Sequence, residues 1–216
     1  DGSKGEEALT EAMERARSQG LTPLLLDGTK DRDGDGLTKL DDFFVARQCQ
    51  MLDARQMFED EKLGERTRDV IKKDTRKMLV DAMAKGSDFY VRLQTKATDL
   101  TSGGYGDEDS IPVSMFDQRE VNTLAPYIKG SEAMLERQKM DSFAKGLWES
   151  GHVLAKALRE GDLDYEGNFY VGAKFGVTVS CQMSQYSEDD DYFATKMQST
   201  LPLLRFKPIH VRATEF

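Results

Sequence analysis

The segment 169–183, FYVGAKFGVTVSCQM, limits the folds open to this chain more than any other stretch. Apolar residues occupy every odd position, and mostly small or polar residues lie between them. This period of two is typical of a strand with one apolar face. Such a strand would span about 50 Å, well beyond the usual five or six residues, so it crosses a large sheet or projects as a hairpin. We interpret it as one arm of a long C-terminal hairpin, with an acidic turn at 187–191 and a returning strand at 192–206.

Two further segments show strand patterns. Residues 89–97 alternate, with Phe89, Val91 and Leu93 on the parity that we expect to be covered. A last short strand is expected at 209–213, after Pro208. These segments predict an antiparallel sheet.

The N-terminal part has the period of helices. Apolar residues recur at helical spacing in 6–19, 40–58 and 65–85, and glycines follow the first and the last of these segments. Further helices are expected near 114–130 and over 131–160. Because helical and alternating patterns are segregated, we predict an α+β fold with a helical N-terminal part and an antiparallel sheet ending in the long hairpin. The expected division is 1–86, helical, and 87–216, α+β, although both can form one continuous domain.

The stretch DRDGDGLTKLDD, residues 31–42, has the chemistry of a calcium loop. Calcium prefers about six to eight hard oxygen ligands, and closely spaced carboxylates repel one another unless a cation lies between them. The loop also needs a bend at its sixth position, which Gly36 provides. The expected ligands are the side chains of Asp31, Asp33, Asp35 and Asp42, and the main-chain carbonyl of Leu37.

This stretch resembles the EF-hand family over about 12 to 20 residues, with an exiting helix whose Phe43 and Phe44 face the core. It departs from that pattern at Thr38, where paired loops have an aliphatic residue, and at Asp42, where Glu is usual. Gly28 and Lys30 indicate that the entering helix is short or absent. The stretch is therefore more similar to single dockerin-like or thrombospondin-like loops than to a cytosolic switch, and the resemblance implies calcium in a structural role.

Two other loops are weaker candidates. Residues 162–173 place acids and a glycine at suitable positions, but Ala173 stands where a closing carboxylate is needed, so we expect a turn. The glycine-rich segment 101–110 lacks the strand before and the helix after it that a phosphate-binding loop requires.

Composition excludes several classes of protein. The chain has 216 residues, a formal net charge of −9 and a pI near 4.9, which disfavours nucleic acid as a partner.

The first residue is Asp1 with no leader after it, so a leader was removed or the sequence is a fragment. We expect an exported, surface or organellar location rather than a cytosolic one. Cys49 and Cys181 can pair in an oxidising compartment, but two isolated cysteines are more typical of small core residues.

No motif indicates an enzyme. A nucleophile and base pair can be drawn from Cys181 and His210, but Cys181 lies on the apolar parity of its strand and has no nucleophile elbow around it. Cysteine and histidine spacing does not fit zinc. We therefore expect a chain without catalytic activity.

The predicted function is a non-enzymatic, calcium-stabilised structural or assembly subunit that associates with other protein chains or with itself. The long hairpin carries this prediction, because an apolar strand of that length needs a covering partner. One alternative is a pore-forming protein whose β-hairpin inserts into a membrane. A second alternative is a calcium-dependent enzyme of unknown class.

Overall fold

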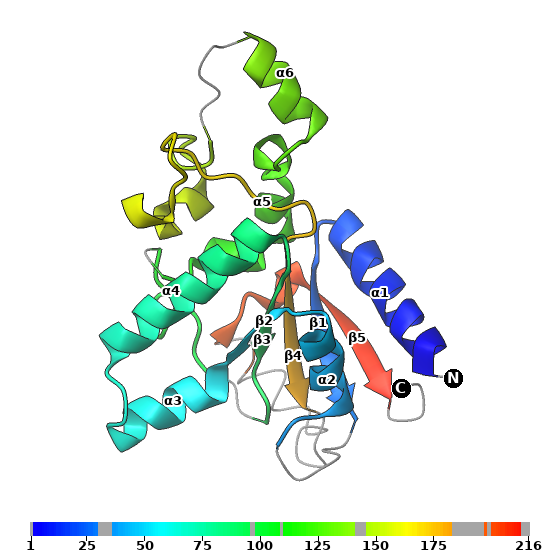
Figure 1. The fold of residues 1–216 in the computed structure, drawn as a ribbon. Helices are drawn as coiled ribbons and strands as arrows, with labels where there is room; N and C mark the ends of the chain where they lie inside the picture. The colour runs from blue at the N-terminus through cyan, green and yellow to red at the C-terminus, as the bar shows by residue number, and fades with distance from the viewer. Residues whose placement is uncertain are drawn as a thin grey trace.

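A five-stranded, all-parallel sheet forms the centre of the protein (Figure 1). The computed structural model describes residues 2–29, 36–95, 98–108, 110–140, 146–182, 197 and 200–212. In spatial order the strands are β2 (Gln50–Asp53), β3 (Asp88–Arg92), β4 (Gly176–Gln182), β1 (Thr22–Gly28) and β5 (Phe206–Arg212). Leu24 of β1 lies opposite Val179 of β4 and Pro208 of β5. The fold is therefore α/β.

The predicted antiparallel sheet and long C-terminal hairpin are wrong. Only the second half of 169–183 is a strand, and this strand, β4, is paired in parallel with β3 on one side and β1 on the other. The predicted turn at 187–191 lies outside the described residues, as does most of the predicted returning strand. Residues Leu203–Arg205, from the end of that segment, form the 3₁₀ helix η6.

The alternation in β4 has a different physical cause from the one expected. Val177 and Val179 are buried in the core on one face of the sheet. Thr178 and Ser180 are also buried, on the opposite face, where their hydroxyl groups hydrogen-bond to Arg17 and Tyr90. Both faces of a parallel sheet are normally covered, and small polar residues can be buried there once they are hydrogen-bonded. The polar positions therefore mark a second covered face and not solvent.

Helices cover both faces of the sheet. On one face, α1 (Gly2–Ser18) and α2 (Lys39–Ala46) pack on β1, β3 and β5 through a small apolar cluster. In this cluster Phe44 stacks on Tyr90, with ring centroids 3.9 Å apart. The other face carries the larger core, to which α3 (Ala54–Leu63), α4 (Arg68–Lys85) and the segment 100–175 contribute.

The expected helices at 6–19 and 65–85 are confirmed by α1 and α4, and Phe43 and Phe44 of the predicted exiting helix are buried. The expected helix at 40–58 is wrong, because β2 interrupts it. Gln48 adopts a left-handed conformation after α2 (φ 57°), and the Asp53 side chain caps the start of α3. The chain thus turns between two short helices, and Leu52 enters the core as part of the sheet.

The segment between β3 and β4 contains short helices. They are α5 (Gln118–Asn122), α6 (Glu132–Met140), η1 (Val113–Phe116), η2 (Ala125–Tyr127), η3 (Val153–Ala157) and η4 (Glu160–Asp162). The expected helix over 131–160 is therefore represented by α6, η3 and η4, while 141–145 lie outside the description. The sheet joins strands from both predicted ranges, 1–86 and 87–216. No helix among the described residues is long and apolar enough to span a membrane.

Candidate functional site

The carboxyl ends of the strands meet at the edge of the sheet where ligands usually bind in α/β proteins. From β1 the chain continues to β2, beyond β3 and β4, whereas from β4 it continues to β5, on the other side of β1. The pair β1 and β4 is thus a topological switch point, and the crevice outside such a point is the usual ligand site of an open parallel sheet. Polar side chains from β1, α2, β2 and β3 meet at this edge.

Hydrogen bonds hold together the two ends of the connection from β1 to α2, which we call its base. Asp27, near the end of β1, accepts hydrogen bonds from the amide and the hydroxyl of Thr29, at 2.8 and 2.6 Å. Its second carboxylate oxygen accepts a bond from the Thr38 hydroxyl at 2.6 Å. Thr38 is the N-cap of α2 and forms a reciprocal capping box with Asp41. One hydrogen bond therefore joins the strand before the loop to the helix after it.

Asp41 turns inward from α2 toward the sheet. It is 1% exposed, and it accepts a hydrogen bond from the Tyr90 hydroxyl at 2.8 Å. The Tyr90 oxygen also lies 2.7 Å from the Ser180 hydroxyl. Because the single phenolic hydrogen is donated to Asp41, Ser180 is the donor in the second bond. This chain of hydrogen bonds links α2, β3 and β4.

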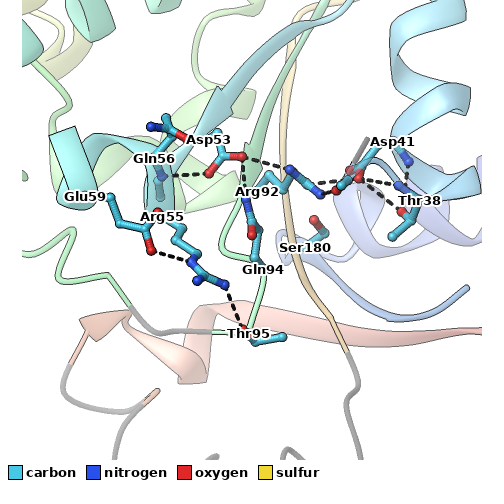
Figure 2. Close-up of polar contacts among 12 residues, drawn as sticks. Thr38, Asp41, Asp53, Arg55, Gln56, Glu59, Arg92, Gln94, Thr95 and Ser180 are labelled. Atoms are coloured by element: carbon cyan, nitrogen blue, oxygen red, sulfur yellow. Dashed lines mark hydrogen bonds and ion pairs between the residues drawn. The ribbon is translucent and has the colours of Figure 1, made fainter. Parts of the chain in front are cut away.

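Arg92, at the end of β3, is the buried cation of the edge (Figure 2). Its Nε lies 2.9 Å from a carboxylate oxygen of Asp41, as an ion pair without hydrogen-bond alignment, and a terminal nitrogen donates to Asp53 at 2.8 Å. Its other terminal nitrogen donates to the Gly36 carbonyl, which lies just before α2. A single guanidinium therefore balances two carboxylates and holds the end of the loop.

Asp53 connects this network to α3. One of its oxygens caps the helix by accepting from the Gln56 amide at 2.9 Å, and the other accepts from the Gln94 side chain at 2.6 Å. Farther along the same edge, Arg55 pairs with Glu59 at 2.8 Å (Figure 2). The polar edge thus extends from α2 to α3.

Burial shifts the acid–base properties of this edge. Desolvation raises the pKa of Asp27 above its ordinary value, although hydrogen bonds from Thr29 and Thr38 oppose the shift. Desolvation, together with the nearby charge of Asp41, raises the pKa of Tyr90 well above 10, and burial raises the pKa of Cys181 to about 12. The site is therefore a low-dielectric network in which the phenol and the thiol stay protonated at neutral pH.

The predicted calcium ligands are only partly described. Asp31, Asp33 and Asp35 lie outside the described residues. Asp42 is exposed in the first turn of α2, with its amide bonded to the Thr38 carbonyl, and Leu37 precedes Thr38, the N-cap of that helix. Within the described ranges no group of three His, Cys, Asp or Glu residues is arranged to hold a metal ion. The carboxylates of Asp27, Asp41 and Asp53 all accept internal hydrogen bonds.

Sequence reasoning missed the supporting residues Asp27, Asp41, Tyr90 and Arg92. Asp27 follows three leucines and precedes a glycine, which is a signal for the end of a buried strand. Arg92 and Tyr90 lie on the parity that was expected to face solvent. Cys181, by contrast, was expected in the core, and the structure confirms this, while His210 is exposed on β5.

Comparisons with known proteins found no match among protein families, curated proteins or solved structures.

Proposed function

We propose that this chain is a non-enzymatic α/β domain that calcium stabilises at the connection between β1 and α2. The observation that carries the proposal is the hydrogen bond between Asp27 and Thr38, which closes the base of an acidic connection. β1 precedes this connection, which is consistent with the expectation that the entering helix of an EF-hand is short or absent here. The helix α2 follows the connection in the place of the exiting helix.

Closing the base favours cation binding for two physical reasons. The fold already holds the ends of the loop together. An ion that binds there therefore does not have to offset the entropy cost of loop closure. The closed base also confines three aspartates, at positions 31, 33 and 35, to a connection of few residues, where their charges repel. Arg92 pairs with Asp41 and Asp53, so this cation is already engaged beside the connection.

The proposal is restricted to calcium binding. Association with other chains, and the alternative of membrane insertion, were both predicted from a long one-sided hairpin. The strand within that segment, β4, has neighbours on both sides, so it offers no unpaired edge for either role. Partner binding therefore needs another surface.

The test is thermal unfolding of the full chain with calcium and with chelator. We expect calcium at a hundred to a thousand times its Kd to add about 3–4 kcal/mol of stability. For a chain of this size the corresponding rise in Tm is roughly 6–16 °C. Asp31→Ala or Asp35→Ala should abolish the calcium-dependent rise. Asp164→Ala, in the weaker acidic turn 162–173, is the matched control and should keep it; equal melting curves with and without calcium in the unmodified chain would refute the proposal.

A second candidate function follows from the position of the same loop. A strand, a glycine-containing loop and a helix are the parts of a phosphate-binding P-loop, and Gly36 and Thr38 fall at the spacing of its last glycine and its hydroxyl residue. However, Asp31 stands where that motif has its first glycine and Leu37 where it has its lysine, and three aspartates lie in the loop, so phosphate would need a bridging divalent cation. Pyrophosphate binding that appears only with calcium or magnesium, and is lost in Asp31→Ala, would favour this candidate.

A further inference from the structure

A groove lies at the opposite, amino-terminal edge of the sheet. It has a volume of about 840 Å³, and its walls come from α1, the turn before β2, the end of α4 and the residues before β4. Its charged lining consists of Arg17, Arg47, Lys85, Lys174, Glu14 and Asp88. Basic side chains are thus in excess here, although the whole chain carries a formal charge of −9.

Arg17 is built into the floor of this groove. A terminal nitrogen donates to Asp88 at 2.6 Å and to the Thr178 hydroxyl at 2.8 Å, while its buried Nε has no partner. Gly176 at the start of β4 leaves room for this pair: a Cβ there would lie 2.7 Å from both the guanidinium carbon and an Asp88 oxygen, so these side chains would have to shift. Asp88 is therefore hydrogen-bonded to Arg17, and its charge also acts on Arg47.

Lys85 and Lys174 are brought together by a close backbone contact. Gly86 ends α4 with φ +68°, and a Cβ on it would lie 2.6 Å from the carbonyl carbon of Gly172. The Gly172 amide donates to the Met83 carbonyl at 2.7 Å, which fixes the two segments against each other. Both lysines are exposed, and within the described part of the chain neither has an ion pair. They are available to a ligand.

Arg47 approaches from the other wall. Its guanidinium lies 4.0 Å from the centre of the Phe43 ring and donates to the Thr10 hydroxyl at 2.9 Å. These contacts hold a planar charged group in place before any ligand arrives, which reduces the entropy lost on binding. Glu14 is the remaining acidic side chain of the lining, so three exposed cations face one exposed carboxylate.

We propose that this groove binds a small molecule carrying two or more negative charges. Its volume is within the range of about 300–1,000 Å³ that is usual for small-molecule sites. Arginine and lysine suit phosphate and carboxylate groups, the first through its planar fork and the second as a point charge. Phe175, which is partly exposed, adds apolar surface to the lining, so a ligand with a small carbon skeleton also fits. A phosphate ester and a polycarboxylate share this chemistry.

The test is calorimetric titration of the full chain with pyrophosphate and with citrate, at low salt and in buffer from which calcium has been removed with a chelating resin. Without calcium, binding here is independent of the loop between β1 and α2, and failure of one proposal leaves the other standing. We expect one ligand per chain, with shifts of the amide signals of Lys85, Gly86 and Lys174. Tighter binding of pyrophosphate identifies phosphate as the natural group, and tighter binding of citrate identifies carboxylate.

Two double variants distinguish binding at this groove from nonspecific electrostatic attraction of an anion to the protein. Lys85→Gln with Lys174→Gln should weaken binding by roughly tenfold or more, because two of the exposed cations are removed. Lys62→Gln with Lys207→Gln removes the same charge from exposed positions outside the groove and should change the Kd less than about twofold. Equal weakening in both double variants, or no binding of either anion to the unmodified chain, would overturn the proposal.

Discussion

Buried charge at the carboxyl edge depends on one arginine. The side chain of Arg92 is 5% exposed, and its two carboxylate partners, Asp41 and Asp53, come from different elements. A carboxylate that loses its partner in a low-dielectric site is strongly destabilised, whereas the intact network contributes little beyond offsetting its own desolvation. The fold thus needs Arg92 because Asp41 and Asp53 would otherwise be buried without a cation.

We predict that Arg92→Met destabilises the chain by about 3–5 kcal/mol, since it leaves the Asp41 charge buried without a cation. Methionine keeps much of the apolar length of the side chain, so the loss reports on charge more than on volume. Arg68→Met is the matched control, because Arg68 pairs with Glu61 at 2.9 Å with 47% of its side chain exposed. That change should cost less than about 1 kcal/mol. Urea denaturation of both variants gives the comparison, and equal costs would contradict it.

At the scale of elements, two helices end on glycine for different reasons. Gly64 ends α3 and Gly86 ends α4, both with positive φ, at 74° and 68°. Beside Gly64 there is open space, whereas Gly86 touches the backbone of Gly172. The end of α4 is therefore also the joint that connects this helix to the segment entering β4.

We predict that Gly64→Ala costs about 1 kcal/mol, which is the strain of a left-handed residue with a Cβ. Gly86→Ala should cost about 2–4 kcal/mol, because the added methyl group must also displace the Gly172 backbone. Thermal or urea denaturation measures both free energies of unfolding. A smaller loss at Gly86 than at Gly64 would show that the contact between the two glycines is not tight in solution.

At the scale of the whole molecule, the helices with a clear apolar stripe and a glycine stop could be predicted, and the sheet could not. β1 is buried at every position except its last, so it shows no alternation, and β2 has only four residues. The alternation of β4 was visible, but a pattern of period two does not say whether the second face meets water or α1 and α2. Strand direction depends on which segments pair, and no local pattern records it.

The sequence could predict only those residues of the candidate site that lie close together along the chain. The aspartates at 31, 33 and 35 stand out because their spacing is a property of the sequence. Arg92 and Asp41 are 51 positions apart and meet only because β3 and α2 pack together, as their ion pair shows. The basic groove likewise draws Arg17, Arg47, Lys85 and Lys174 from four separate segments. Sites of this second kind follow from the fold and not from a motif.

The pairing of β1 with β4 can be tested with a single new cysteine. Leu26 of β1 lies opposite Cys181 of β4, and both side chains belong to the larger core on the same face of the sheet. Neighbouring strands are about 4.7–4.9 Å apart, within the range of Cα separations that a disulfide can bridge. In the background Cys49→Ser, we therefore predict that Leu26→Cys forms a disulfide with Cys181. Leu25→Cys, whose side chain belongs to the core on the other face, should not.

The oxidation must take place during refolding, because burial raises the pKa of Cys181 to about 12 and so removes the reactive thiolate from the folded protein at neutral pH. Refolding in a glutathione buffer, followed by a non-reducing gel and intact mass, distinguishes the two variants. The closed ring would contain most of the chain, so the linked form should migrate faster than the reduced one. In an antiparallel sheet built from 169–183 and 192–206, Cys181 would have no neighbour in β1. A disulfide at Leu25→Cys, or none at Leu26→Cys, would therefore contradict the pairing of Leu26 with Cys181 in neighbouring strands.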